Sequence, residues 1–167
     1  MRYAIYFLPG PNSDLAEFGA RWLGWNIATG EAPAHPVVPG LPDEVSRLTA
    51  APKKYGFHAT LKAPFHLAPG KPQKQLSIEL HDLAQDFAPF EIGRLQVTNL
   101  GGFLALTERS PTKALKTFAR DCVERFDRFR APLTEAERTR RRKANLTERQ
   151  DALLRAWGYP YVLDEYR

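Results

Sequence analysis

Prolines and glycines divide this chain into short segments, and they restrict its fold more than any other feature of the sequence. The 167 residues include 14 prolines and 11 glycines. Proline lacks the backbone N–H that a helix interior or a central strand requires, so a cluster of these residues favours a break between elements. The densest cluster, GEAPAHPVVPGLP at 30–42, predicts a loop. We therefore expect short helices and strands that are joined by sharp turns.

Apolar periodicity within the segments predicts an α+β fold. Alternation of period two indicates strands, and apolar residues at spacings of three and four indicate helices. Strands are expected at 2–8, 57–62, 90–98, 103–107 and 161–167, and helices at 14–30, 43–49, 72–88, 112–129 and 147–158. In the short helix at 43–49, Val45 and Leu48 are expected to face inward. The apolar stripe of the helix at 72–88 is expected to consist of Leu76, Leu80, Leu83 and Phe87, and the inward face of the helix at 147–158 of Leu153, Leu154 and Trp157. This order favours a mostly antiparallel sheet that is covered by helices.

Local signals predict where several of these elements begin and end. The first strand is apolar on both faces, so it is expected to be buried on both sides. Gly30 is expected to end the first helix, and Pro64 the second strand. A turn at 99–102 is expected between the strands at 90–98 and 103–107, because its paired glycines supply positive φ. Thr147 and Gln150 form a capping-box pattern at the start of the last helix, and Gly158 is expected to stop that helix.

The composition excludes several classes of protein and site. No apolar run reaches the ~20 residues of a membrane span, and the N-terminus lacks the features of a signal peptide. The single cysteine, Cys122, suits a reducing cytosol, so we expect a cytoplasmic protein. The length of 167 residues favours a single domain. The histidines and this cysteine lack metal-ligand spacing, and no glycine-rich phosphate-binding loop occurs. The net charge of +5 favours an anionic partner such as a phosphate ester or nucleic acid.

The triplet His58-Ala59-Thr60 is the strongest candidate for a chemical site. In a strand, residues i and i+2 point to the same face, so the imidazole and the hydroxyl would converge with Cα atoms about 7 Å apart. Histidine exchanges a proton near neutral pH, and a threonine hydroxyl can donate to a phosphoryl oxygen. Lys62 continues the same row and Tyr55 lies just before it, so both are candidates for substrate contact. A strand histidine that is hydrogen-bonded only to its neighbours is the alternative interpretation.

Aromatic and thiol side chains outside the triplet are interpreted mainly as core. Trp22 and Trp25 recur at helical spacing with Phe18, which favours core packing over base stacking. Cys122 lies on an apolar stripe and is expected to be buried rather than to act as a nucleophile. Tyr6, on the first strand, is a candidate for lining a substrate groove, and core packing is the simpler interpretation.

The densest basic cluster lies at 138–143. Contact with phosphate or nucleic acid is one interpretation of this cluster. A solvated helix face, in which Glu135 and Glu137 pair with the cations at i,i+3 or i,i+4, is favoured because no aromatic residues interleave as stacking platforms.

The run PKKYGFHATLKAPF at 52–65 resembles the first motif of the two-histidine (2H) phosphoesterase superfamily, which includes RNA 2′,5′-ligase-like cyclic phosphodiesterases. The opening segment 3–25 and the C-terminal segment 146–167 resemble a branch of this superfamily that is associated with phosphonate metabolism. The resemblance therefore extends over nearly the whole chain.

This resemblance implies a fold and a mechanism. The family fold has two similar lobes around a central groove, and each lobe contributes one H-x-T/S triplet. The two histidines act as general acid and general base on 2′,3′-cyclic or 1″,2″-cyclic phosphates, and the hydroxyls bind phosphoryl oxygens. Neither a metal nor an organic cofactor is implied. His58 and Thr60 match the first triplet and take these roles by resemblance.

The sequence departs from the family pattern at the second triplet. His35, His66 and His81 have no hydroxyl residue at i+2, so no second H-x-T occurs. In the family that triplet lies on the strand after the WGYP turn, and 161–167 resembles the beginning of this strand, so we expect the chain to lack its C-terminal portion.

Two functions are predicted from these observations. The first is a metal-independent phosphoesterase that acts by histidine acid–base catalysis on a small cyclic phosphate or on a nucleotide or RNA end. The alternative is a phosphate- or RNA-binding module that retains half of a catalytic groove. An accessory protein of phosphonate metabolism is a third reading of the resemblance. No membrane partner is expected, and the oligomeric state is left open.

Overall fold

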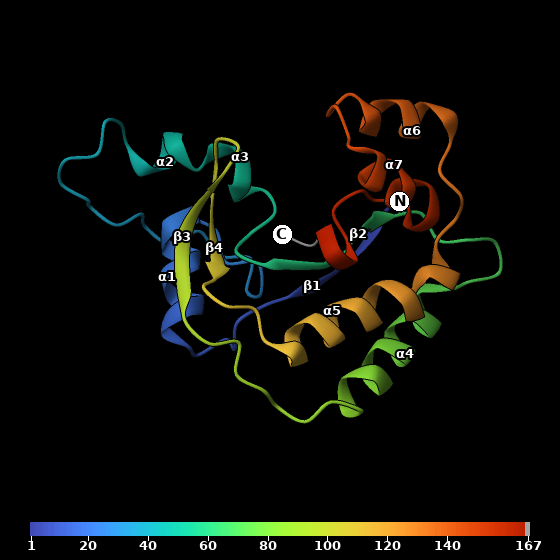
Figure 1. Ribbon diagram of the computed structural model, residues 1–167. Helices are drawn as coiled ribbons and strands as arrows, with labels where there is room; N and C mark the ends of the chain where they lie inside the picture. Colours follow the sequence, from blue (N-terminus) through green and yellow to red (C-terminus); the bar gives the residue numbers. More distant parts are fainter. Residues whose placement is uncertain (166–167) are drawn as a thin grey trace. The chain divides into compact units, whose positions relative to one another are not determined.

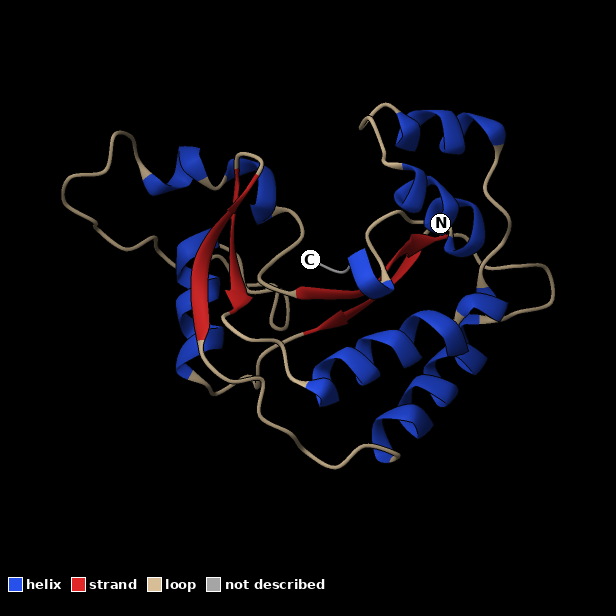
Figure 2. Cartoon of the chain, viewed as in Figure 1, coloured by secondary structure: helices blue, strands red, loops and turns tan. Residues whose placement is uncertain are grey.

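The computed structural model describes residues 1–165 of the chain and has an α+β fold, as predicted (Figures 1 and 2). The strands are β1 (Tyr3–Phe7), β2 (Ala59–Phe65), β3 (Leu95–Leu100) and β4 (Phe103–Glu108). The α-helices are α1 (Asp14–Leu23), α2 (Val45–Leu48), α3 (Ala50–Lys53), α4 (Gln73–Gln85), α5 (Lys113–Arg125), α6 (Glu135–Arg142) and α7 (Glu148–Trp157). Two short 3₁₀ helices are η1 (Asp127–Phe129) and η2 (Leu163–Glu165). No helix among the described residues is long and apolar enough to cross a membrane.

Within the described residues, the strands form two two-stranded sheets. One sheet pairs β1 with β2. The other pairs β3 with β4 in antiparallel register, from Leu95 opposite Glu108 to Leu100 opposite Phe103. Gly101 and Gly102 both have positive φ and form the turn of this hairpin, as their pairing in the sequence predicted.

The chain divides into two compact units. Unit 1 contains Met1–Ile5 and the residues from Leu61 onward, and unit 2 contains Tyr6–Thr60. The sheet of β1 and β2 has residues in both units. The two similar lobes that the family resemblance implies remain a prediction.

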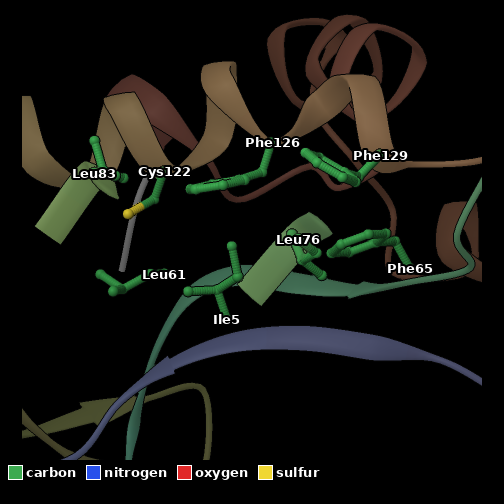
Figure 3. Close-up of a cluster of buried hydrophobic side chains, with 8 residues drawn as sticks. All are labelled: Ile5, Leu61, Phe65, Leu76, Leu83, Cys122, Phe126 and Phe129. Carbon is green, nitrogen blue, oxygen red and sulfur yellow. The ribbon is translucent and has the colours of Figure 1, made fainter. Parts of the chain in front are cut away.

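The main core lies in unit 1. Figure 3 shows its side chains between the helix α5 and the strands β1 and β2. Eight buried residues form this cluster: Ile5, Leu61, Phe65, Leu76, Leu83, Cys122, Phe126 and Phe129. Leu76 and Leu83 belong to the predicted stripe of α4, and two further members of that stripe, Leu80 and Phe87, are partly buried against the cluster. Helix amphipathicity therefore accounts for the α4 side of this core.

A smaller cluster holds the C-terminal part of unit 1 together. Val123 of α5, Leu153 of α7 and Val162 are its buried members. Trp157 packs against them, so the predicted inward face of α7 is confirmed.

Two expectations about the first strand and helix are wrong. Ile5 is the buried residue of β1, the opposite face with Ala4 and Tyr6 is only half-buried, and Phe7 is 47% exposed, so the strand is not buried on both sides. The first helix ends at Gly24 rather than Gly30, because Gly24 adopts the left-handed conformation and its N–H bonds carbonyl groups of the last turn. The ring of His35 also lies where a Cβ at Gly24 would be.

The second strand also differs from its prediction. It starts at Ala59, just after His58, and passes through Pro64 to end at Phe65. A strand of a two-stranded sheet has an unpaired side, where proline is tolerated because no backbone N–H is needed. Pro64 therefore does not end the strand.

The predicted helix at 43–49 is present as α2, with α3 directly after it. Val45 is buried as expected, but Leu48 is exposed. Thr49 is buried in its place, and its hydroxyl donates to the Val45 carbonyl oxygen at 2.7 Å. The prediction for Leu48 was wrong because a hydroxyl that bonds to its own chain can be buried in place of an apolar side chain.

Other boundaries differ at the ends of the later elements. The third strand begins at Leu95, whereas Phe90 contacts the Phe118 ring outside any strand. Residues 161–165 form bends and η2 instead of the predicted strand, and 166–167 lie outside the described residues. The capping box of Thr147 and Gln150 is confirmed, and Gly158 ends α7 in the left-handed conformation.

Candidate functional site

The loop between α3 and β2 sets the position of His58. Gly56 in this loop has a φ of 70°, a conformation that glycine adopts without strain. A Cβ on Gly56 would lie 2.6 Å from the Cβ of Ile27, so the close approach of Ile27 also requires glycine. His58 follows two residues later, immediately before the first residue of β2.

A hydrogen bond fixes the tautomer of neutral His58. Its Nδ1 lies 2.9 Å from the Gly56 carbonyl oxygen. A carbonyl oxygen only accepts hydrogen bonds, so Nδ1 carries the proton and donates. The lone pair of the neutral ring is then on Nε2, so Nε2 is the nitrogen that can accept a proton.

The ring of His58 is stacked on Tyr6. The two ring centroids are 3.8 Å apart, and the ring planes differ by 25°. Both side chains are half-buried, and both belong to unit 2. The structure therefore brings together two of the five residues that the sequence singled out, from segments that are far apart in the chain.

Thr60 and Tyr55 lie on either side of His58 in the sequence. Thr60 is half-buried on β2, two residues beyond His58. Tyr55 is 53% exposed, and the Lys54 ammonium lies 5.7 Å from the centroid of its ring. Their roles in binding a substrate remain predictions.

Lys62 lies in the interior of unit 1 and is only 4% exposed. Its ammonium donates to the Val123 carbonyl oxygen at 2.9 Å and to Asp127 Oδ1 at 3.2 Å. Burial lowers the pKa of Lys62, and the Asp127 carboxylate partly offsets this effect. These contacts favour a structural role, and its assignment as a substrate contact remains a prediction.

Arg130 shares the carboxylate of Asp127 with Lys62. Its Nε and Nη2 donate to the two carboxylate oxygens at 2.8 and 3.0 Å, and Nη2 also donates to the Ala156 carbonyl oxygen. Sequence analysis missed this network. Asp127 and Arg130 carry no motif, and the amphipathic spacing of 112–129 was the only signal in this part of the chain.

The basic cluster on α6 is largely engaged within the protein. Arg138 pairs with Glu135 at 3.0 Å, in the i,i+3 arrangement that we predicted. Arg142 pairs with Asp151 of α7 at 2.7 Å. Arg141 lies over the Tyr159 ring, with 5.2 Å between its guanidinium carbon and the ring centroid. These contacts agree with the structural interpretation of the cluster.

Cys122 is fully buried, as predicted. Burial raises the pKa of its thiol to about 12, so the reactive thiolate is scarce at neutral pH.

Trp22 and Trp25 are half-buried, and Phe18, which stacks on Trp22, is 50% exposed. The aromatic residues of α1 and the turn after it are therefore less buried than we expected when we assigned Trp22 and Trp25 to the core.

Residues 1–165 contain no group of three or more His, Cys, Asp or Glu side chains that could hold a metal ion.

An open pocket of about 740 Å³ in unit 2 lies beside α1 and the loop at 26–33. Glu17, Arg21 and Glu31 are its charged lining residues, and His58 does not line it. The pocket is therefore separate from the stacked pair of Tyr6 and His58.

Comparison with known proteins places the chain in a wider context. Residues 60–167 match the model of a family that is described as "Protein of unknown function (DUF1045)". A "Ribose 1,5-bisphosphate phosphokinase PhnN" from Janthinobacterium sp. (strain Marseille) is 42% identical over 99% of this chain and 37% of its own length. A protein of the same name from Laribacter hongkongensis (strain HLHK9) is 35% identical over 100% of this chain and 38% of its own length. No solved structure matches the chain.

Proposed function

The chain belongs to the DUF1045 family, and we propose that it is a metal-independent phosphoesterase that uses His58 for proton transfer on a small cyclic phosphate. We also propose that it is a member of the two-histidine phosphoesterase superfamily. The motif at 52–65 and the resemblance along the rest of the chain support this assignment.

The observation that supports this function most is the fixed tautomer of His58. The Gly56 carbonyl oxygen holds the Nδ1 proton, so the same nitrogen, Nε2, is presented to a ligand each time the ring is neutral. One positioned proton-transfer group accelerates a reaction by about 10²–10⁴-fold. A histidine held in one tautomer is suited to acid–base chemistry, because the same nitrogen meets the ligand in each cycle.

Hydrolysis of a cyclic phosphodiester requires two proton transfers. Nε2 of His58 takes a proton from the attacking water or gives one to the leaving oxygen, and solvent water exchanges the other proton. The new P–O bond forms as one ring P–O bond breaks, and the product is a phosphomonoester with a free hydroxyl group. Thr60 would donate a hydrogen bond to a phosphoryl oxygen, on which negative charge is concentrated.

We propose that the substrate is a ribose phosphate that carries a five-membered cyclic phosphate ring. The name of both relatives specifies a kinase that acts on ribose 1,5-bisphosphate, and this chain spans 37% and 38% of their lengths. The chain contains no GxxxxGK[ST] loop, so we assign it a different reaction on a related sugar phosphate. Opening of a 1,2-cyclic phosphate on ribose 5-phosphate would supply a ribose 1,5-bisphosphate. Such a reaction fits the phosphonate metabolism that the resemblance implies.

The test is a turnover assay with 2′,3′-cyclic nucleotides and with ribose 1,2-cyclic phosphate 5-phosphate, in the presence of EDTA. We expect product to form, and His58→Gln to lower the rate by about 10²–10⁴-fold. His81→Gln is the matched control, because His81 lies on α4 and belongs to no H-x-T triplet. Turnover that persists in His58→Gln, or that EDTA abolishes, would contradict the proposal.

A phosphate-binding module is the second candidate function. The single H-x-T triplet and the net charge of +5 favour it. It predicts salt-dependent binding of the same ligands without product. Multiple turnover by the 167-residue protein would exclude it.

A further inference from the structure

We propose that Tyr6 is a positioning residue for His58. Its ring fixes the orientation of the imidazole plane, so that Nε2 points toward a bound ligand. The effect of this on catalysis rests on the function proposed above, whereas the orientation of the ring does not.

The two contacts of His58 restrict different motions. The χ2 torsion of histidine has a broad energy profile, so a single hydrogen bond leaves the ring free to tilt. The Nδ1–Gly56 bond fixes one edge of the ring, and the face of Tyr6 at 3.8 Å fixes its plane. With both contacts present, the direction of Nε2 is defined.

The position of Tyr6 follows from the β1–β2 sheet. Tyr6 lies on β1, and His58 immediately precedes β2, the strand that pairs with β1. Pairing of the two strands therefore carries the phenol ring to the imidazole, although more than fifty residues separate them in the sequence. Gly56, whose carbonyl oxygen accepts from Nδ1, is itself packed closely against Ile27, which lies where a Cβ of Gly56 would be.

The stack also suits the charged form of His58. When Nε2 takes a proton, the imidazole becomes an imidazolium, and Nδ1 continues to donate to the Gly56 carbonyl oxygen. The face of an aromatic ring carries partial negative charge and attracts a cation that lies against it. Tyr6 thus stays a favourable neighbour through the proton transfer instead of opposing it.

The experiment compares Tyr6→Phe with Tyr6→Leu in two measurements. The first is the NMR spectrum of the His58 ring, which is assigned by its absence from His58→Gln. We expect the Tyr6 ring to shift the His58 ring protons upfield, Tyr6→Phe to retain that shift and Tyr6→Leu to lose it. The second is steady-state kinetics, in which Tyr6→Leu lowers kcat by about 10- to 100-fold at a KM within twofold, and Tyr6→Phe keeps kcat within about threefold.

Phe18→Leu is the matched control, because Phe18 is another stacked aromatic of unit 2 and its partner is Trp22. It should change neither measurement. Unchanged His58 shifts in Tyr6→Leu would overturn the proposal, as would a Tyr6→Phe variant that is as impaired as Tyr6→Leu. If the shifts change as expected and no variant or parent protein has turnover, the orientation stands and the proposed enzyme function fails.

Discussion

At the residue scale, Lys62 shows how this protein holds a charge in its interior. Its ammonium and the Arg130 guanidinium bind one carboxylate, that of Asp127. Two cations therefore share a single anion. Each loses hydration on burial, and the carboxylate with two backbone carbonyl groups replaces that hydration.

Removal of the shared carboxylate should destabilise the protein strongly. Asp127→Asn leaves Lys62 and Arg130 without their counter-charge, and breaking a buried pair in this way costs about 3–5 kcal/mol. We expect the free energy of unfolding, measured by urea denaturation, to fall by that amount.

Glu124→Gln is the matched control for this variant. Glu124 pairs with Arg120 on the exposed face of α5, and exposed pairs contribute about 0–1 kcal/mol. If Asp127→Asn lost no more stability than Glu124→Gln, the buried pair would not be a stabilising contact.

At the element scale, capping fixes the start of the two C-terminal helices. Thr134 and Glu137 form a capping box at α6, and Thr147 and Gln150 form one at α7. Each box satisfies backbone N–H groups that have no partner within the first helical turn. The ion pair of Arg142 with Asp151 then connects α6 to α7.

Loss of the α7 cap should have a moderate effect. Thr147→Ala removes the hydroxyl that accepts from the Gln150 N–H at 3.2 Å. We expect the free energy of unfolding to decrease by about 1 kcal/mol, measured by thermal or urea denaturation. Thr147→Ser keeps the hydroxyl and should retain most of this stability. Equal losses in both variants would show that the threonine methyl group, rather than the cap, is responsible.

At the scale of the whole molecule, the two units differ in how they are held. Unit 1 contains the large buried cluster between α4, α5 and the strands. Unit 2 contains a long segment without helix or strand, 24–44, between α1 and α2. Backbone amides with few buried apolar neighbours open more readily than those in a packed core.

Hydrogen exchange should therefore distinguish these regions. We expect the amides of α5 near Cys122 to be protected by at least about 10³-fold more than those of the loop at 30–42, because core amides open only with most of the fold. Exchange monitored by mass spectrometry or NMR measures this directly. Similar protection in both regions would contradict this distribution of stability.

Element types and helix caps could be predicted well from the sequence, because they depend on residues within a few positions of one another. The α7 capping box, the Gly101–Gly102 turn and the apolar stripe of α4 are confirmed. The errors concern burial and boundaries. Phe7 and Leu48 are exposed because burial depends on which neighbours cover a face, and periodicity does not specify these neighbours.

For the candidate site, the sequence by itself determined which residues have the required chemistry. It placed His58 and Thr60 two residues apart and showed that only one such triplet is present. Only the tertiary structure decided what surrounds them, with Tyr6 against the imidazole and Lys62 in the core beside Asp127. The physical reason is that spacing along the chain is a local property of the backbone. Stacking and ion pairing join segments that lie far apart in the chain, and folding of the whole molecule sets their positions.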